Sequence, residues 1–590
     1  MIGPGTAPVV SGVRPSPDPR VGLKAGYWDA AEALWNMKRL STTTPNERNL
    51  GTTRSDLAFT GKYAIQGNYN GFQIYDISNP AKPEVVNTYY CPASQNDVSV
   101  YKNLLFMSSE ATNSRLSCSF AEGLAPMAPA DKERMRGVRI FDISDVKNPK
   151  LVTSVQTCRG SHTHTVVTDQ SDDSNVYIYV SGTSSVRSAE EVPGCADGGI
   201  DDPNTARFRL EVIKVPLRAA ERAAIVSSPR IFQGLPVPPR NDERAASDER
   251  DRQAAAAAAA AEGRGRQGGG GRGRGNQGPP TGPNQCHDIT VYPEIGLAAG
   301  ACAGLGLLLD IHDPSHPVRL DAAADANMSF WHSATFSNDG SKVLFTDEWG
   351  GGGQPRCRAT DKKEWGANAL FTIDNRKLTF HGYYKLPAAQ TPQENCVAHN
   401  GSLIPIPGRD IMVQGWYQGG LSVFDWTDVD HPQEIAYFDR GPIDEKRMVM
   451  GGSWSAYWYN GVIVSSEIAR GLDIYELLPS GLISENELAA AKTVKTPYLN
   501  TQDQQKIVWA PSFAVARAYL DQLERSKGLA AETIATARTT LATAERSGSQ
   551  RKAALTQLAS QLNTAAASAR DQAKVRTLST AVTDLANAPR

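Results

Sequence analysis

Short runs of alternating apolar and polar residues, each followed by a turn, recur along about the first 480 residues of the chain. One run reads GFQIYDISNPAKPEVV from Gly71, and related runs start at Gly137 and Gly420. A shorter form starts at Leu305, and a truncated form, GLDIYEL, starts at Gly471. Alternation with a period of two predicts a half-buried strand, and the Pro, Asn and Asp residues after it predict a turn into a second strand.

A second hairpin precedes each of these runs, as in NDVSVYKNLLFMSSE at 96–110 and HSATFSNDGSKVLFTDE at 332–348. Two hairpins make a four-stranded unit of about 40 residues, which is the period of a propeller blade. Counting hairpins predicts an all-β, seven-bladed β-propeller, although degenerate motifs in two blades leave six or eight open. The last blade has only three strands, so we expect a strand near 48–53 or earlier to close the ring. The predicted blades are 54–91, 95–158, 161–232, 286–327, 330–387, 394–442 and 451–479.

The IYDIS and IFDIS strands with their Asn-Pro turns resemble LVIVD-repeat proteins of bacterial cell surfaces and secretomes. The resemblance covers about 400 residues. It implies a propeller and a secreted or surface binding role, and it implies no particular chemistry.

Three segments fall outside the predicted propeller of residues 54–479. Residues 1–53 are expected to form an N-terminal arm, and the pattern of residues 25–45 predicts a short helix followed by a loop. Residues 240–285, with eight consecutive alanines and a Gly/Arg-rich run, predict a solvated insert rather than a single-strand nucleic-acid site, because they lack aromatic residues for base stacking. Residues 480–590 are rich in alanine at helical spacing and predict two or three antiparallel helices, separable from the propeller and suited to association, with breaks at Gly528 and Gly548.

Charge and hydropathy narrow the classes of partner. With 61 basic and 63 acidic residues the net charge is -2, which gives no argument for nucleic acid or anionic lipid as a partner. No run of eighteen apolar residues is present, so no transmembrane helix is expected. The opening MIGPGTAPVVSG has no basic and apolar leader, so any export signal is not visible in this sequence.

Eight cysteines favour disulfides and an extracellular, periplasmic or cell-surface location, with eight free thiols as the alternative. Eight cysteines allow 105 pairings, but the repeat restricts them. Cys286 opens a strand and Cys302 ends the next one, so the hairpin brings them opposite each other. The same logic predicts the remaining pairs Cys91–Cys118, Cys158–Cys195 and Cys357–Cys396.

Histidines recur at one position of the repeat, the residue that opens the first strand of a blade. Because first strands are innermost, equivalent positions on neighbouring blades converge on the central channel. His164 lies two residues beyond His162 and is a fifth candidate ligand. The candidate metal ligands are therefore His162, His164, His287, His332 and His399.

Glutamates recur at the end of the second strand, at Glu110, Glu348 and Glu467. We expect them behind the histidines, where a carboxylate accepts the second ring N–H and fixes the tautomer. Imidazole ligands suit a late first-row metal such as Fe, Cu or Zn. The alternative is that the histidines only cap the channel mouth through hydrogen bonds.

Two functions follow from these patterns. The first is a binding scaffold that uses the histidine face for a protein or small-molecule ligand. The second is a metal-dependent oxidoreductase or oxygenase. The four-histidine outline is similar to that of carotenoid cleavage oxygenases, although the sequence motifs of that family are absent.

Overall fold

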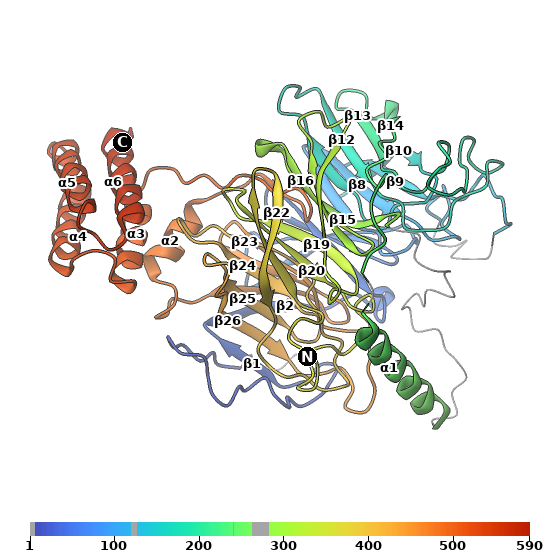
Figure 1. Cartoon of the computed structure of the whole chain (residues 1–590), viewed down its shortest axis with the longest axis horizontal. Helices are drawn as coiled ribbons and strands as arrows, with labels where there is room; N and C mark the ends of the chain where they lie inside the picture. Colours follow the sequence, from blue (N-terminus) through green and yellow to red (C-terminus); the bar gives the residue numbers. More distant parts are fainter. Residues whose placement is uncertain (1–5, 120–126, 240, 262–282, 590) are drawn as a thin grey trace.

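The computed structural model describes residues 6–119, 127–239, 241–261 and 283–589. The Gly/Arg-rich part of the insert predicted at 240–285 lies outside these residues. Figure 1 shows a mostly β body with a bundle of helices on one side.

Most strands form antiparallel sets of four in which consecutive strands pair, so the body is propeller-like. Five sets are separate sheets, and the strand β30 (Tyr498–Leu499) adds to the edge of the first. These sets are β3 (Arg54–Thr60), β4 (Tyr63–Asn68), β5 (Gly71–Asp76) and β6 (Glu84–Tyr90); β7 (Val98–Tyr101), β8 (Leu104–Ser109), β9 (Gly137–Asp142) and β10 (Lys150–Gln156); β11 (Thr165–Thr168), β12 (Asn175–Val180), β13 (Glu211–Pro216) and β14 (Ala224–Ser227); β15 (Cys286–Tyr292), β16 (Leu297–Cys302), β17 (Leu305–Asp310) and β18 (Val318–Ala324); and β19 (Trp331–Phe336), β20 (Lys342–Asp347), β21 (Asn368–Asp374) and β22 (Lys377–Tyr384).

Two further sets join into one nine-stranded sheet through a short parallel pairing of β23 with β27. The strand β2 (Met37–Thr43) pairs with β29 and completes the last set, which is the closing strand expected from the N-terminal region. The strand β1 (Glu32–Trp35) pairs with β26 at the other edge. The other strands of this sheet are β23 (Asn400–Ile404), β24 (Ile411–Gly415), β25 (Leu421–Asp425), β26 (Gln433–Arg440), β27 (Ser453–Tyr459), β28 (Val462–Glu467) and β29 (Gly471–Leu477).

The first strands of the sets pack against one another in cyclic order. Contacts run from β3 to β7, β11, β15, β19, β23 and β27, and from β27 back to β3. The start of each first strand therefore faces a common centre, as the histidine prediction requires.

The recurrent Asp of the sequence motif has a local structural role. In β5, Phe72 and Ile74 are buried, and the carboxylate of Asp76 accepts the backbone N–H of Ser78 at 2.9 Å. Asp142 accepts the N–H of Ser144 in the same way at 2.8 Å. The Asp side chain thus ends the strand and starts the turn into the fourth strand.

The helix predicted at residues 25–45 is wrong, because this segment contains β1 and β2. Its apolar residues Leu34, Trp35 and Met37 are buried on the sheet edges that β26 and β29 offer. Pairing with an open edge satisfies the backbone groups of both partners, and this outweighs the helical spacing of the segment.

All four predicted disulfides are present, and no cysteine is free among the described residues. The bonds are Cys91–Cys118, Cys158–Cys195, Cys286–Cys302 and Cys357–Cys396. Four disulfides indicate an oxidising extracellular or periplasmic environment.

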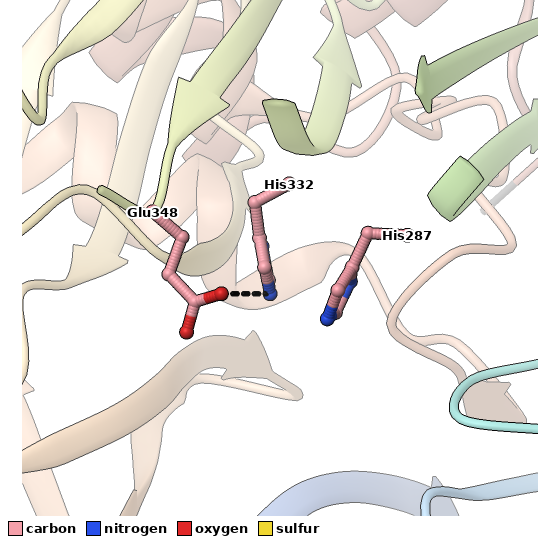
Figure 2. A group of neighbouring side chains, drawn as sticks. All are labelled: His287, His332 and Glu348. Atoms are coloured by element: carbon pink, nitrogen blue, oxygen red, sulfur yellow. Dashed lines mark ion pairs between the residues drawn. The ribbon is translucent and has the colours of Figure 1, made fainter. Parts of the chain in front are cut away.

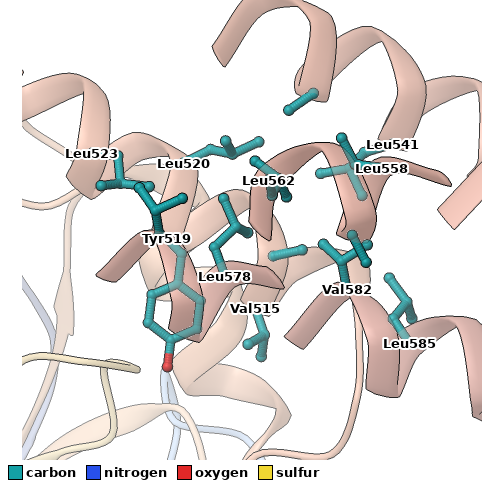
Figure 3. Close-up of a cluster of buried hydrophobic side chains, with 14 of the residues drawn as sticks. Val515, Tyr519, Leu520, Leu523, Leu541, Leu558, Leu562, Leu578, Val582 and Leu585 are labelled. Atoms are coloured by element: carbon teal, nitrogen blue, oxygen red, sulfur yellow. The ribbon is translucent and has the colours of Figure 1, made fainter. Parts of the chain in front are cut away.

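The C-terminal region contains more helices than the two or three predicted. Glycines 528 and 548 lie in breaks between helices as expected, and a further break occurs before Asp571, which caps the last helix. Leu520, Leu541, Leu558 and Leu578 form part of a common apolar core (Figure 3). The helices are α2 (Glu485–Thr493), α3 (Phe513–Arg525), α4 (Ala531–Arg546), α5 (Arg551–Ala566) and α6 (Gln572–Asn587).

The region beyond 480 is also tied to the β body. Between α2 and α3 the chain crosses the first strands: Asn500 bonds to both backbone groups of Val100, and Gln504 bonds to both of Phe336. The backbone of Val291 bonds to Gln502 and Gln504.

The insert helix α1 (Asp242–Ala261) contains the alanine run and is attached to the body at its N-terminal half. Short 3-10 turns occupy η1 (Glu47–Asn49), η2 (Ala220–Arg222) and η3 (Pro293–Ile295). None of the helices in the described ranges has the length and apolar character needed to cross a membrane.

Candidate metal centre

The histidines of the repeat register lie side by side at the centre of the β body. The ring centroids of His162 and His287 are 4.6 Å apart, those of His287 and His332 are 3.9 Å apart, and those of His332 and His399 are 4.1 Å apart. They come from the starts of four successive sets of strands, so the rotational repeat brings them together.

Two of these histidines and one glutamate form the tightest donor group. One ligand atom each of His287, His332 and Glu348 lie within 4.8 Å of one another (Figure 2). Among the described residues this is the only group of three or more His, Cys, Asp or Glu side chains that meets that limit. Glu348, which we expected behind the histidines, is thus itself a candidate ligand.

Oxygen acceptors fix the tautomers of three histidines. The Nδ1–H of His162 donates to Glu110 at 2.6 Å, and that of His287 donates to Asp288 at 2.9 Å. The Nδ1–H of His399 donates to the carbonyl oxygen of Trp454. When Nδ1 carries the proton, Nε2 keeps its lone pair, which is the state that a metal needs.

Burial keeps the imidazoles neutral. It lowers the pKa of His399 to about 3 and that of His332 well below the usual value. It also lowers the pKa of His287, against the opposing effect of Asp288. Neutral imidazole is the ligating form of histidine.

Glu348 lies between two rings in an apolar wall. Its carboxylate oxygens are 3.7 Å from Nε2 of His332 and 3.6 Å from Nε2 of His399, and it accepts the hydroxyl of Tyr417 at 2.5 Å. Burial raises the pKa of Glu348 to about 8, although the Tyr417 hydrogen bond opposes this. The apolar wall consists of Trp349, Trp365, Val397, Tyr417, Trp454 and Ile468.

Two ring nitrogens in this cluster are buried without a hydrogen-bond partner, Nδ1 of His332 and Nε2 of His399. A buried polar atom without a partner costs free energy. The unpaired Nε2 of His399, with its proton held on Nδ1, is therefore suited to donate to a cation. Two imidazoles and one carboxylate are a donor set that suits Fe(II) or Zn(II).

Access to the cluster is greatest at His162. Its side chain is 22% exposed, against 9% for His287 and 1% for His332. The cluster is therefore shielded on the side of His399 and open on the side of His162.

Two candidate residues make other contacts. His164 turns toward the second set of strands, where its Nδ1 bonds to the hydroxyl of Ser108 at 2.8 Å. Glu467 pairs with Arg470 at 3.1 Å and accepts the backbone N–H of Gly452, and within the described ranges no histidine contact is found for it. His164 precedes β11, outside the regular alternation of the strand, so its ring does not follow that of His162, which bonds to Glu110.

Sequence reasoning missed two contributors. Asp288, which holds the ring of His287, was not among the candidate residues. Tyr417 follows the end of β24, and nothing in the repeat marks it. The only usable signal in the sequence was that Asp288 directly follows His287, one of the histidines at the recurring repeat position.

A surface cavity of about 790 Å³ lies elsewhere, between the edges of β22 and β26. It is lined by residues that include Arg14, Lys385 and Glu434, and by none of the candidate metal ligands.

Comparison with known proteins identifies a repeat and gives no function. The family model of the LVIVD repeat matches residues 51–90, which confirms the resemblance read from the sequence. No curated protein matches the chain.

Several solved structures share a distant likeness. A putative 6-phosphogluconolactonase from Bacteroides uniformis is 11% identical with a TM-score of 0.39, covering 70% of this chain and 89% of its own. A periplasmic gluconolactonase from Pseudomonas aeruginosa is 10% identical with a TM-score of 0.37, covering 64% and 83%. Hydrazine synthase from Kuenenia stuttgartiensis is 9% identical with a TM-score of 0.40, covering 70% and 92%. At these scores the likeness carries no argument about activity.

Proposed function

We propose that the chain is an exported, seven-bladed LVIVD-repeat propeller that binds a transition-metal ion at its centre and presents that face to a protein or small-molecule ligand. The cyclic contacts of the first strands and the completion of the last set by β2 support the seven blades. The LVIVD match and the four disulfides support an exported surface protein.

The observation that carries the metal proposal is the group formed by His287, His332 and Glu348. Their ligand atoms lie within 4.8 Å of one another, and the neighbouring Nε2 of His399 is buried and unpartnered. Three protein ligands in one small volume fit a metal that keeps further positions for exogenous ligands.

Metal analysis of the purified full chain tests this proposal. The wild type should hold about one equivalent of iron or zinc, and the double variant His287→Ala/His332→Ala should hold less than about a tenth of that. Glu348→Gln should weaken binding about 10- to 100-fold, because the neutral amide is a poorer ligand.

The matched control is His316→Ala/His431→Ala, which removes two exposed histidines with side chains 69% and 83% exposed. This control should keep its metal. The proposal is wrong if the two double variants hold equal amounts of metal. It is also wrong if the wild type, refolded with iron and zinc, stays free of metal and has unchanged stability.

A second candidate function is a metal-dependent oxidoreductase, and the two-histidine, one-carboxylate set favours it. That set with open positions is typical of Fe(II) oxygenases. The Tyr417 hydroxyl on Glu348 adds a proton-carrying group beside the ligands.

Binding of nitric oxide to the Fe(II)-loaded protein tests this second function. An electron paramagnetic resonance signal from the nitrosyl complex shows a coordination site open to small molecules, which the enzyme requires and the scaffold allows. Full occupancy by iron without such a signal would remove the enzyme candidate.

A further inference from the structure

The surface cavity of about 790 Å³ between β22 and β26 has fixed walls. Small-molecule pockets have volumes of about 300–1,000 Å³, so this cavity is large enough for an organic ligand. The disulfide Cys357–Cys396 holds the loop that supplies Cys357 to the lining. The backbone N–H of Gln390 donates to the carbonyl oxygen of Cys357 at 2.8 Å, which joins this loop to the segment after β22. A ligand therefore meets walls that are already in place.

The three acidic side chains of the cavity lining are all engaged by other groups. The pairs are Asp361 with Arg358, Glu434 with Arg20 and Asp430 with His381, each at 2.8 Å. Arg20 and His381 do not belong to the lining, so two of the three carboxylates are engaged from outside it. The side chain of Asp430 is also 57% exposed, so water screens its charge.

The lining also contains cationic side chains without a counter-ion. Arg14, Lys363 and Lys385 form no ion pair within the described part of the chain. Lys385 directly follows β22 and is the least exposed of the three. Its Nζ donates to the carbonyl oxygen of Lys362 at 2.9 Å, which uses one of its three N–H donors. Two donors of a positioned ammonium group thus remain for a ligand.

The surroundings of Lys385 disfavour its positive charge. Burial lowers the pKa of Lys385 to about 8, although the charge of Asp361 opposes this. A negative charge bound beside the ammonium group would offset the cost of its burial. The charge distribution of the lining therefore favours an anionic ligand.

The lining next to Lys385 is apolar. Residues 386–389 have the sequence Leu-Pro-Ala-Ala and continue directly from Lys385, while Val429 and Pro432 precede β26. Ligand pockets typically combine such apolar surface with a few polar groups that fix the orientation of the ligand. An apolar wall beside one ammonium group suits a molecule with an anionic head and an apolar body.

We propose that this cavity binds a small organic anion, with a carboxylate or phosphate head at Lys385 and an apolar body against residues 386–389, Val429 and Pro432. The exposed side chains of Arg14 and Lys363 border the same cavity and attract the anion. None of the candidate metal ligands lines the cavity. This site and the metal centre can therefore each fail without the other.

Isothermal titration of the full chain with benzoate and with phenyl phosphate tests this inference. At least one of these probes should bind with one site per chain, and the tighter one identifies the head group. Benzamide, which has the ring without the charge, should bind at least about tenfold more weakly than benzoate. Inorganic phosphate, which has the charge without the ring, should bind at least about tenfold more weakly than phenyl phosphate.

Matched variants locate the binding site. Lys385→Gln should weaken the tighter probe at least about tenfold, because it removes the ammonium group. The control Lys377→Gln removes one charge from the other end of β22, where the side chain is 64% exposed and outside the lining, and should bind as the wild type does. The double variant His287→Ala/His332→Ala should also bind as the wild type does. If Lys385→Gln does not fold, Ala389→Glu replaces it, because a carboxylate in the lining repels the anion and should weaken binding to the same extent.

Four outcomes would overturn the inference. The wild type binds neither benzoate nor phenyl phosphate, or it binds the ring without charge or the charge without ring as tightly as the complete probe. Lys385→Gln, or Ala389→Glu in its place, binds as tightly as Lys377→Gln. The double variant His287→Ala/His332→Ala loses the binding, which would place the probe at the metal centre.

Discussion

Asp503 is a buried carboxylate in the segment that crosses the first strands. Its side chain is 4% exposed, and Oδ2 has no hydrogen-bond partner in the described part of the chain. Burial and the charge of Glu294 raise the pKa of Asp503 to about 7. Because an unfolded aspartate ionises near pH 4, folding keeps a proton on this side chain between these two values.

The sign of the pH dependence follows from this raised pKa. As the pH rises above about 4 the unfolded chain loses this proton first, so the folded state loses stability until about pH 7. A difference of about three pKa units corresponds to roughly 4 kcal/mol at pH 8. The variant Asp503→Asn has no ionisable group at this position, so it should raise the Tm at pH 8 and change it little at pH 4 in thermal unfolding. The control Asp374→Asn removes an exposed carboxylate at the end of β21. A Tm difference that is the same at both pH values would contradict this assignment.

At the same scale, the histidine positions could be predicted from the sequence and their partners could not. His162, His287, His332 and His399 occupy equivalent positions of a rotational repeat, so spacing alone brings them together. The group that holds His399 is a backbone carbonyl, that of Trp454, which any residue type would supply. Which backbone carbonyl meets the ring of His399 depends on the path of the chain, and the pattern of residue types does not predict that path.

Among the elements, helix α1 is attached to the loop that follows the candidate ligand Glu348. Arg356, which is fully buried, donates to Asp248 at 2.9 Å and to Asp251 at 2.6 Å. The indole N–H of Trp349 also donates to Asp248, at 2.5 Å. Two carboxylates on one face of α1 thus hold the loop beside the metal centre.

Arg356→Ala should release the N-terminal half of α1. Removing one partner of a buried pair leaves the other charges uncompensated, which costs about 3–5 kcal/mol. Trypsin should then cleave at Arg250 or Arg252 of α1 at least about tenfold faster, as measured by limited proteolysis and mass spectrometry. The control Arg376→Ala breaks an exposed pair with Asp310 and should leave the cleavage rate unchanged. Equal cleavage of both variants would show that Arg356 does not hold the helix.

The elements that the sequence predicted best are those with a local cause. Strand β5 and its relatives follow from alternation and from the Asp-capped turn, and both lie within a few residues. The arm at 32–43 was predicted as a helix, because its strands exist only by pairing with β26 and β29, which are about 400 residues away in sequence. Non-local pairing of this kind leaves no period in the segment itself.

At the scale of the whole molecule, the chain between α2 and α3 connects the sets of strands from one side. Besides Val100, Val291 and Phe336, it bonds to Leu57 through Thr501 and to Pro405 through Trp509. These contacts reach first strands, or residues directly after them, in different sets. We therefore propose that the separable helical region begins after residue 509 and not at 480.

Two truncations test this boundary. Removal of residues 511–590 takes away α3 to α6 and keeps the crossing segment, so the β circular dichroism signal and its Tm should change little. Removal of residues 498–590 also takes away the bonds to Val100, Val291 and Phe336, together with the strand β30. At about 1 kcal/mol for each hydrogen bond, this longer truncation should lower the Tm clearly, or prevent folding.

The two truncations differ only in residues 498–510, so the shorter one is the matched control for the loss of the helices. If both melt alike at the wild-type temperature, the crossing segment does not stabilise the β body. If both unfold, the helices α3 to α6 belong to the folding unit of the strands.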